Sequence, residues 1–452
     1  YRQFSPHRSF SPLVFFVRWW SVSLSSCGVR IIMAGEEAEE LFSAQLELEA
    51  LEFGDELTKG AKWSPDGTCL LSASEDCVVR LFEAPESVLQ GTSSEAEWKA
   101  TLHCRHAETV YDYAWYPMMH SSVPVSCIFA TSSRDHPIHL WDAFDGSHRA
   151  SYRGYDHLDE LDSAISLGFS PTGEKLYAGY ERCVRVFRTS NPGRGCQTFA
   201  TAKTRRDRSG QKGLVGAVAV SSGSFAVGSY DKSVALYDER SGSRETDVLR
   251  DKGMGGVTSL VFDADDGLGV TLWSGGRNER EGAVRGWDLR MGRVTRRCPR
   301  RAATNQRIGF SIKGRALVTG SDDCRALVYD LRDDTLKGSI DCGDVVNGAA
   351  FHPHLPLIAT ATGQRRFGRE KDDSDSDEET PKARPAVNSI RVWRYDETRL
   401  PSRSTETPEA MLLDEPAETP PDGTPDMLIQ PAVESPWTAV ATESSSTMLI
   451  QP

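Results

Sequence analysis

The feature that most constrains the fold is a short hydrophobic segment with an aromatic residue near its end, which recurs seven times. Its copies are VVRLFEA (78–84), IHLWDA (138–143), VRVFRT (184–189), VALYDE (234–239), VRGWDL (284–289), ALVYDL (326–331) and IRVWRY (390–395). The aromatic falls at Phe82, Trp141, Phe187, Tyr237, Trp287, Tyr329 and Trp393. Self-similarity at such an interval indicates that each copy belongs to one supersecondary unit that cannot bury its faces alone.

Two further hydrophobic segments precede each aromatic, and turn residues separate them. In the first copy they are KGAKWSPDG and LLSASED, and in the third FSPTG and LYAGYE. The order of strand, Pro/Gly turn, strand, Asp turn and strand describes one blade of a propeller. The sequence therefore resembles the WD40 family and predicts an all-β, seven-bladed propeller over residues 41–396. No strand follows IRVWRY, so we expect an N-terminal strand near Ser43 to Phe53 to close the ring.

Outside the repeats the composition changes. Residues 1–40, whose first Met is Met33, are interpreted as a leader or a disordered segment. The stretch 368–386, which contains DDSDSDEE, is predicted to be a disordered acidic insert, and 397–452 a disordered low-complexity tail. Ser374 and Ser376 in the insert are candidate phosphorylation sites. The net charge of −13 is concentrated in the acidic segments, so the remaining chain is net positive.

Blade two contains residue types that resemble a catalytic triad. A nucleophilic site needs a base within reach of the hydroxyl and an oxyanion hole facing a pocket. The same types at these offsets form a structural hydrogen-bond network in WD40 proteins, and that is the interpretation we adopt for His106, Ser132, Asp135 and Trp141. His103 and Cys104 lack partners at zinc-finger spacing. The sequence predicts no catalytic residue, no metal and no cofactor, and its apolar runs are too short for a membrane span.

Arginine is unevenly distributed. Ten Arg lie between Arg277 and Arg307 against three acidic residues. Loops that join a blade's last strand to the next blade, and loops between its second and third strands, open on one rim. The basic residues that this scheme places on the rim are Lys203, Arg205, Arg206, Arg277, Arg296, Arg297, Arg300, Arg301 and Arg365. A cationic rim with aromatic and amide side chains suits RNA, but it also suits an acidic protein partner or mere solubility.

Several stretches extend beyond generic WD40 spacing. They include TVYDYAWYPMM (109–119), SSRDHPIHLWDAFDGSHRASYRGYDHLDEL (132–161), TNQRIGF (304–310) and FHPHLPLIATATGQR (351–365). They resemble the telomerase Cajal body protein family, also called WD40-encoding RNA antisense to p53. Family-like loops on the predicted rim contain Arg134, His136, Asp156, His157, Gln306, Arg307, Gln364 and Arg365.

The resemblance implies a non-catalytic, RNA-binding scaffold. Such a protein recognises the Cajal body localisation element of small H/ACA guide RNAs and telomerase RNA. It directs the dyskerin-containing ribonucleoprotein to Cajal bodies, and it supports telomerase assembly and telomere maintenance. It also implies a nuclear protein with a cytoplasmic fraction, monomeric and folded with help from the cytosolic ring chaperonin. The alternative is a protein-only scaffold, such as a ligase substrate receptor or a chromatin reader.

Overall fold

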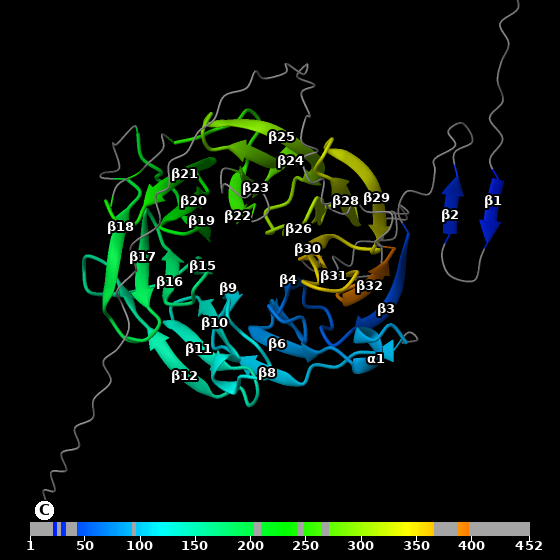
Figure 1. Ribbon diagram of the computed structural model, residues 1–452, viewed down its shortest axis with the longest axis horizontal. Helices are drawn as coiled ribbons and strands as arrows, with labels where there is room; N and C mark the ends of the chain where they lie inside the picture. Colours follow the sequence, from blue (N-terminus) through cyan, green and yellow to red (C-terminus); the bar gives the residue numbers. More distant parts are fainter. Residues whose placement is uncertain are drawn as a thin grey trace, which may run out of the picture. The chain divides into compact units, whose positions relative to one another are not determined.

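The computed structural model describes residues 21–24, 29–32, 43–92, 96–202, 209–242, 244, 248–263, 271–365 and 387–396. Within these residues, seven sheets of three or more strands stand around a central channel (Figure 1). The prediction of an all-β, seven-bladed propeller is therefore confirmed. The described helices are one turn of α-helix, α1 (Glu86–Leu89), and a 3₁₀ turn (Pro124–Ser126). None of the described helices has the length and apolar character needed to span a bilayer.

Each blade runs from an innermost strand beside the channel to an outermost strand at the edge. We number the blades in chain order. Blade one is β4 (Thr58–Trp63), β5 (Cys69–Ser74), β6 (Val78–Glu83) and β8 (Leu102–Arg105). Blade two is β9 (Val110–Trp115), β10 (Ile128–Ser133), β11 (Ile138–Asp142) and β12 (His148–Tyr152). Blade three is β15 (Ser166–Phe169), β16 (Lys175–Gly179), β17 (Cys183–Arg188) and β18 (Cys196–Ala200).

The same order continues around the ring. Blade four is β19 (Val215–Val220), β20 (Ser224–Ser229) and β21 (Ser233–Asp238), with a bridge from Val234 to Leu249 at its outer side. Blade five is β22 (Gly256–Phe262), β23 (Thr271–Arg277), β24 (Glu279–Asp288) and β25 (Arg293–Ala302). Blade six is β26 (Phe310–Lys313), β27 (Ala316–Thr319), β28 (Arg325–Asp330) and β29 (Thr335–Asp341).

Blade seven joins distant parts of the chain, as the sequence predicts. It contains β30 (Val346–Phe351), β31 (Leu357–Thr362), β32 (Ile390–Tyr395) and the N-terminal β3 (Ala44–Ala50). β3 pairs antiparallel with β32, and the blue and orange strands lie side by side in Figure 1. Two ion pairs reinforce this contact, Arg391 Nε to Glu49 Oε1 at 2.7 Å and Arg394 Nε to Glu47 Oε1 at 2.9 Å. The ring is therefore closed by a strand from outside the seven repeats.

Short strands lie outside the seven blades. β7 (Ala96–Glu97) pairs parallel with β3, and β13 (Gly154–Tyr155) pairs with β14 (Leu161–Asp162) in the connection after β12. β1 (Ser21–Leu24) and β2 (Val29–Ile32) form a separate hairpin within the segment interpreted as a leader. The predicted acidic insert lies entirely outside the described residues, as do the tail from residue 397 and the unit Ser404–Pro452.

The repeated aromatic residue explains why the blades pack. Phe82, Phe187, Tyr237, Trp287 and Tyr329 are buried against neighbouring sheets. Trp141 and Trp393 are half-buried, and each indole N–H donates to a threonine on the adjacent strand. Large aromatic side chains contribute most of the apolar area in such interfaces. The repeat therefore encodes the contacts between blades as well as the strands.

Candidate nucleic-acid interface

One end of the central channel opens into a pocket of about 540 Å³, which we call the mouth. Its walls come from the starts of β4 and β9 and from loops of blades one, five, six and seven. The lining residues are Leu57, Lys59, Ala73, Glu75, Thr109, Val110, Tyr111, Tyr113, Arg277, Thr304, Asn305, Gln306, Arg307, Asn347, Gln364 and Arg365. Five of the predicted site residues thus come together here from three separate segments of the chain, namely Arg277 at the end of β23, Gln306, Arg307, Gln364 and Arg365.

The mouth contains more cations than carboxylates. Lys59, Arg277, Arg307 and Arg365 line it together with a single acidic side chain, Glu75. Glu75 is shared, because it pairs with Lys59 at 3.4 Å and also with Arg365. Burial lowers the pKa of the Lys59 amine, and the attraction of Glu75 opposes that effect. The excess positive charge is concentrated in a concave site, where field lines focus.

Aromatic rings accompany these cations. Tyr111 and Tyr113 line the pocket, and the guanidinium of Arg277 lies 4.0 Å from the centre of the Tyr230 ring. Arg277 also donates to the carbonyl oxygen of Asn305 at 2.9 Å, which fixes its plane. Burial raises the pKa of Tyr111, so its phenol is neutral at physiological pH. Neutral rings and an oriented guanidinium are surfaces on which an unstacked base can lie.

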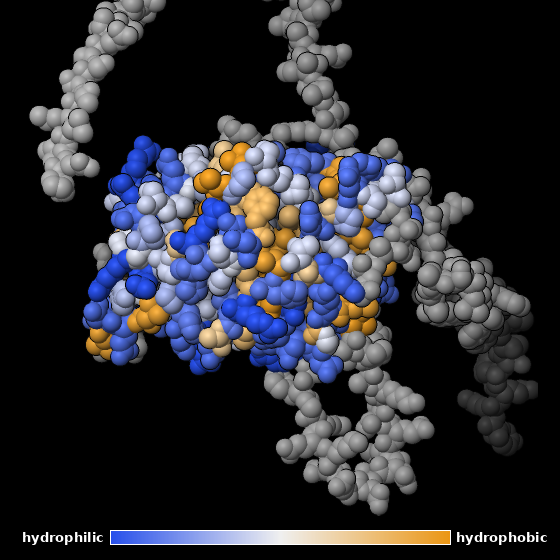
Figure 2. Space-filling model, turned by 90° about the horizontal axis from the view of Figure 1, so that it is seen from below, coloured by the Kyte–Doolittle hydropathy of each residue, from blue (hydrophilic) through white to orange (hydrophobic). Residues whose placement is uncertain are grey.

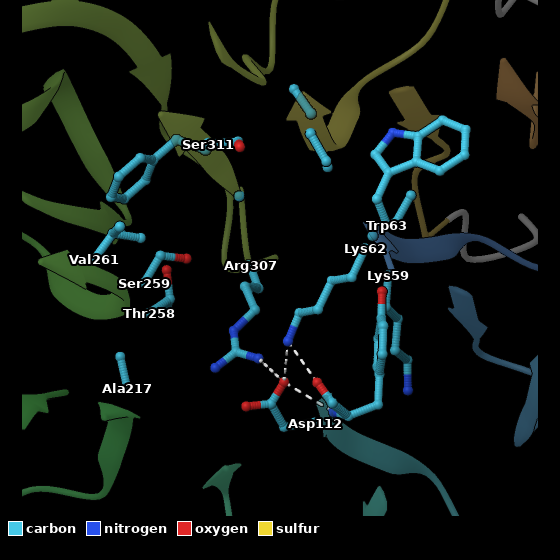
Figure 3. Close-up of a pocket in the computed structure, with 18 of the residues that line it drawn as sticks. Lys59, Lys62, Trp63, Asp112, Ala217, Thr258, Ser259, Val261, Arg307 and Ser311 are labelled. Carbon is cyan, nitrogen blue, oxygen red and sulfur yellow. Dashed lines mark hydrogen bonds and ion pairs between the residues drawn. The ribbon is translucent and has the colours of Figure 1, made fainter. Parts of the chain in front are cut away.

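A second cavity of about 510 Å³ occupies the channel next to the mouth, and Arg307 belongs to both. Figure 3 shows Arg307 and Lys62 converging on the buried carboxylate of Asp112. Arg307 lies 2.8 Å and Lys62 3.1 Å from Asp112 Oδ1, and Leu167 N–H donates to Oδ2 at 2.9 Å. Burial alone would raise the pKa of Asp112, but the two cations hold it below its usual value.

This arrangement assigns Arg307 a structural task. Its second amino group donates to the carbonyl of Gly216 at 2.7 Å, so one side chain connects the loop before blade six to blades two and four. Among the predicted rim residues at the mouth, Arg307 therefore has its guanidinium committed to protein partners. We assign it to the floor of the mouth rather than to ligand contact.

Four predicted arginines lie elsewhere, on the outermost strand β25. Arg297, Arg300 and Arg301 line a separate groove, and Arg296 lies on the same strand near Asp334 at 3.9 Å. Arg300 is 4% exposed and donates to Ile308 O, Thr319 Oγ1 and Gly276 O. The expectation that these arginines join the others at one rim fails because 296–301 is a strand rather than a loop, with side chains alternating between its faces.

The exposed guanidinium groups of β25 have acidic partners. Arg297 makes two bonds to Asp251, at 2.6 and 2.7 Å, and Arg301 lies 3.3 Å from Asp322. Arg296 lies near Asp334, so Arg296, Arg297 and Arg301 each face a carboxylate. We refer to Arg296, Arg297, Arg300 and Arg301 as the edge arginines.

The remaining predicted rim residues do not line the mouth. Arg134 and His136 lie in the turn after β10, where His136 Nδ1 is 2.6 Å from the carbonyl oxygen of Arg134. His157 is 85% exposed between β13 and β14, with Nδ1 3.7 Å from Asp156 Oδ2. The predicted residues Lys203, Arg205 and Arg206 lie outside the described residues, as do Ser374 and Ser376.

The predicted structural network in blade two is only partly assembled. The His106 ring packs edge-on against Trp141, with centroids 5.4 Å apart. The indole N–H of Trp141 donates to Thr131 Oγ1 at 2.8 Å, whereas Ser132 Oγ bonds the carbonyl of Asp112. Asp135 has its side chain 74% exposed beside Arg134. Thr131 therefore replaces Ser132 as the partner of the tryptophan, and Asp135 lies outside the network.

Sequence reasoning missed Lys59, Tyr111, Tyr113, Asn305 and Tyr230. Lys59 and Tyr111 are the second residues of innermost strands, so aligning the starts of those strands across the repeats would have pointed to them. Tyr230 lies in the turn after β20. Its contact with Arg277 joins blades four and five, and no local pattern predicts it.

The comparisons with known proteins agree with this architecture. The model of the WD domain, G-beta repeat, matches residues 58–83. Telomerase Cajal body protein 1 of Homo sapiens is 40% identical over 335 residues, which cover 71% of this chain and 59% of the relative. Its homolog in Drosophila melanogaster is 33% identical over the same length, covering 71% of this chain and 59% of the relative.

A relative in Schizosaccharomyces pombe, guanine nucleotide-binding protein negative regulator 1, is 30% identical over 360 residues, 74% of this chain and 87% of the relative. The chain spans about 60% of the length of the telomerase Cajal body proteins that it matches. The resemblance predicted from the sequence is confirmed by these identities and by the seven-bladed ring. The chain belongs to the telomerase Cajal body protein family of WD40 propellers.

Proposed function

We propose that the protein is a non-catalytic adaptor that captures a single-stranded RNA loop in the mouth. The carrying observation is the convergence of Lys59, Arg277, Arg365 and Tyr111 around one concave opening, with the Arg277 guanidinium lying on the ring of Tyr230. Arginine and lysine hold phosphates there, and tyrosine rings accept unstacked bases. The amides of Asn305, Gln306 and Gln364 supply donors and acceptors for base edges.

The family suggests which RNA is bound. Relatives named telomerase Cajal body protein support the proposal that the ligand is the localisation element of small H/ACA guide RNAs and telomerase RNA. On this proposal the protein acts in the nucleus with dyskerin-containing particles, directs them to Cajal bodies, and supports telomerase assembly. A cytoplasmic fraction and folding by the ring chaperonin belong to the same proposal.

Photo-crosslinking to a hairpin RNA, followed by mapping of the crosslinked peptides, tests the site. We expect crosslinks at the peptides that contain Tyr111 and Tyr230, and a several-fold loss of crosslinking for Arg277→Glu. Arg301→Glu is the matched control, because Arg301 is 68% exposed but lies on β25. Crosslinks confined to β25, or equal loss for both variants, would overturn the assignment of the mouth.

A protein-only scaffold is the second candidate. It is favoured by the name of the fission yeast relative, which describes a regulator of another protein. Crosslinking and sequencing of RNA bound in cells separates the candidates. Recovery of small H/ACA-type RNAs supports the adaptor, whereas recovery of none supports the scaffold.

A further inference from the structure

Two histidines and a serine on the outer strands of blade two point at one another. His139 on β11 and His148 on β12 bring Nδ1 and Nε2 to 3.1 Å. Ser151 Oγ lies 3.0 Å from the first nitrogen and 2.8 Å from the second. The three atoms therefore form a nearly equilateral triangle. Strands β11 and β12 lie in the lower part of the ring in Figure 1, and Figure 2 views the molecule from below that side.

The pairing of the two strands explains this triangle. His139 is opposite Ser151 in the register, and Trp141 is opposite His148, with an irregularity between Leu140 and Trp141. A bulge of this kind re-aims a side chain and increases local twist. It brings His148 onto the face that His139 and Ser151 share. The Trp141 ring lies 5.9 Å from both imidazole rings and forms one wall of the site.

The chemistry of the three atoms suits a metal ion. His139 and His148 each present a ring nitrogen, and Ser151 presents a hydroxyl oxygen, to the same small space. Imidazole nitrogen in its neutral form binds Zn²⁺ and the neighbouring transition metals.

The distances also suit an ion. With metal–nitrogen bonds of about 2.0–2.1 Å, neighbouring ligand atoms lie roughly 2.9–3.4 Å apart in six- and four-coordinate sites. The observed edges fall close to this range. Within the described part of the chain, no three His, Cys, Asp or Glu side chains are grouped to hold a metal. The site thus offers two imidazoles and one hydroxyl, and water must complete the coordination.

We propose that His139 Nδ1, His148 Nε2 and Ser151 Oγ form a binding site for a divalent transition-metal ion such as Zn²⁺. A bound ion would join β11 to β12 and stabilise blade two by mass action, because the three ligands are assembled only in the folded chain. The site lies on outer strands, apart from the residues that line the mouth. It is thus independent of the proposed RNA capture.

Calorimetric titration of the full chain with ZnCl₂, after removal of metals with a chelator, tests the proposal. We expect one Zn²⁺ to bind the wild type and to raise its thermal midpoint. We expect His148→Ala, which removes one of the three ligands, to weaken binding at least about tenfold, because even the loss of a residue that only supports a ligand costs about tenfold or more. His148 is exposed, so this variant retains the fold, whereas His139→Ala removes a half-buried ring. His157→Ala is the matched control, since His157 lies in the exposed turn between β13 and β14.

Co²⁺ distinguishes this site from the cysteines of the chain. A Co²⁺ spectrum without thiolate charge-transfer bands, which disappears in His148→Ala and persists in His157→Ala, supports two-histidine coordination. A spectrum with thiolate bands would overturn the proposal. Equal Zn²⁺ affinity for wild type and His148→Ala would overturn it too, as would a thermal midpoint that Zn²⁺ leaves unchanged in the wild type.

Discussion

The mouth and strand β25 are both rich in arginine, but their charges are balanced differently. At the mouth, Lys59 and Arg365 share the carboxylate of Glu75, and Arg307 pairs with Asp112 at the floor. Arg277 lies on a tyrosine ring without a carboxylate partner among the described residues. On β25 each exposed edge arginine has an aspartate, and Arg300 is buried on carbonyl and hydroxyl oxygens. A local count of arginines therefore does not locate a binding surface. Whether each arginine already has a carboxylate partner within the protein is the more informative property.

The largest loss of stability should come from a buried arginine of blade five whose guanidinium, like that of Arg300, is held by protein partners. Arg285 is 1% exposed and bonds both oxygens of Glu279 at 3.0 Å as well as Asp251 at 2.9 Å. Arg285→Ala leaves a buried carboxylate without its partner, so we expect a loss of about 3–5 kcal/mol in the free energy of unfolding. Chemical denaturation measures it. The control Arg290→Ala, at a 66% exposed side chain, should change little; equal losses would show that Arg285 is not committed to the fold.

A second effect concerns His352, a polar group committed to the seam between blades one and seven. Its ring bonds the carbonyl of Gly67 at 2.9 Å and packs on Trp63. Burial lowers its pKa to about 4 from 6.5, so the unfolded chain takes up the proton first as the pH falls. The stabilisation is complete above pH 6.5 and is lost as the pH falls towards 4, by at most about 3 kcal/mol.

Thermal unfolding of His352→Gln between pH 7 and pH 4 measures this contribution. Glutamine can still donate to Gly67 but does not titrate, so the variant should lose less stability on acidification than the wild type. An identical pH dependence in both proteins would assign the acid sensitivity to other groups, among them His106, whose pKa is also lowered to about 4.

The smallest effect tests the revised partner of Trp141. Thr131→Val removes the hydroxyl that accepts the indole N–H while keeping the shape of the side chain. We expect a loss of about 1 kcal/mol, typical of one buried hydrogen bond. Asp135→Ala should cost less, because its side chain is exposed. A larger loss of stability for Asp135→Ala than for Thr131→Val would contradict this revision and would support the network predicted from the sequence, in which Asp135 takes part.

The sequence predicts the blades well because each blade is a local unit with its own aromatic residue. It also predicts the closing strand, since an open edge after IRVWRY needs a partner. It does not predict that 296–301 is a strand, although Cys298, Arg300 and Ala302 are buried at alternate positions. Contacts between blades, such as Arg277 with Tyr230 or Arg307 with Asp112, join residues far apart in the chain. They depend on loop geometry that no short pattern encodes.

The salt dependence of hairpin RNA binding tests the central claim most directly. Log affinity should fall with log salt by roughly 0.7 per neutralised phosphate of a single strand. The variant Arg277→Glu with Arg365→Glu should reduce this slope and weaken binding, whereas Arg297→Glu with Arg301→Glu should leave the slope close to that of the wild type. A slope that is reduced by the β25 pair and unchanged by the mouth pair would contradict the assignment of the mouth as the RNA site.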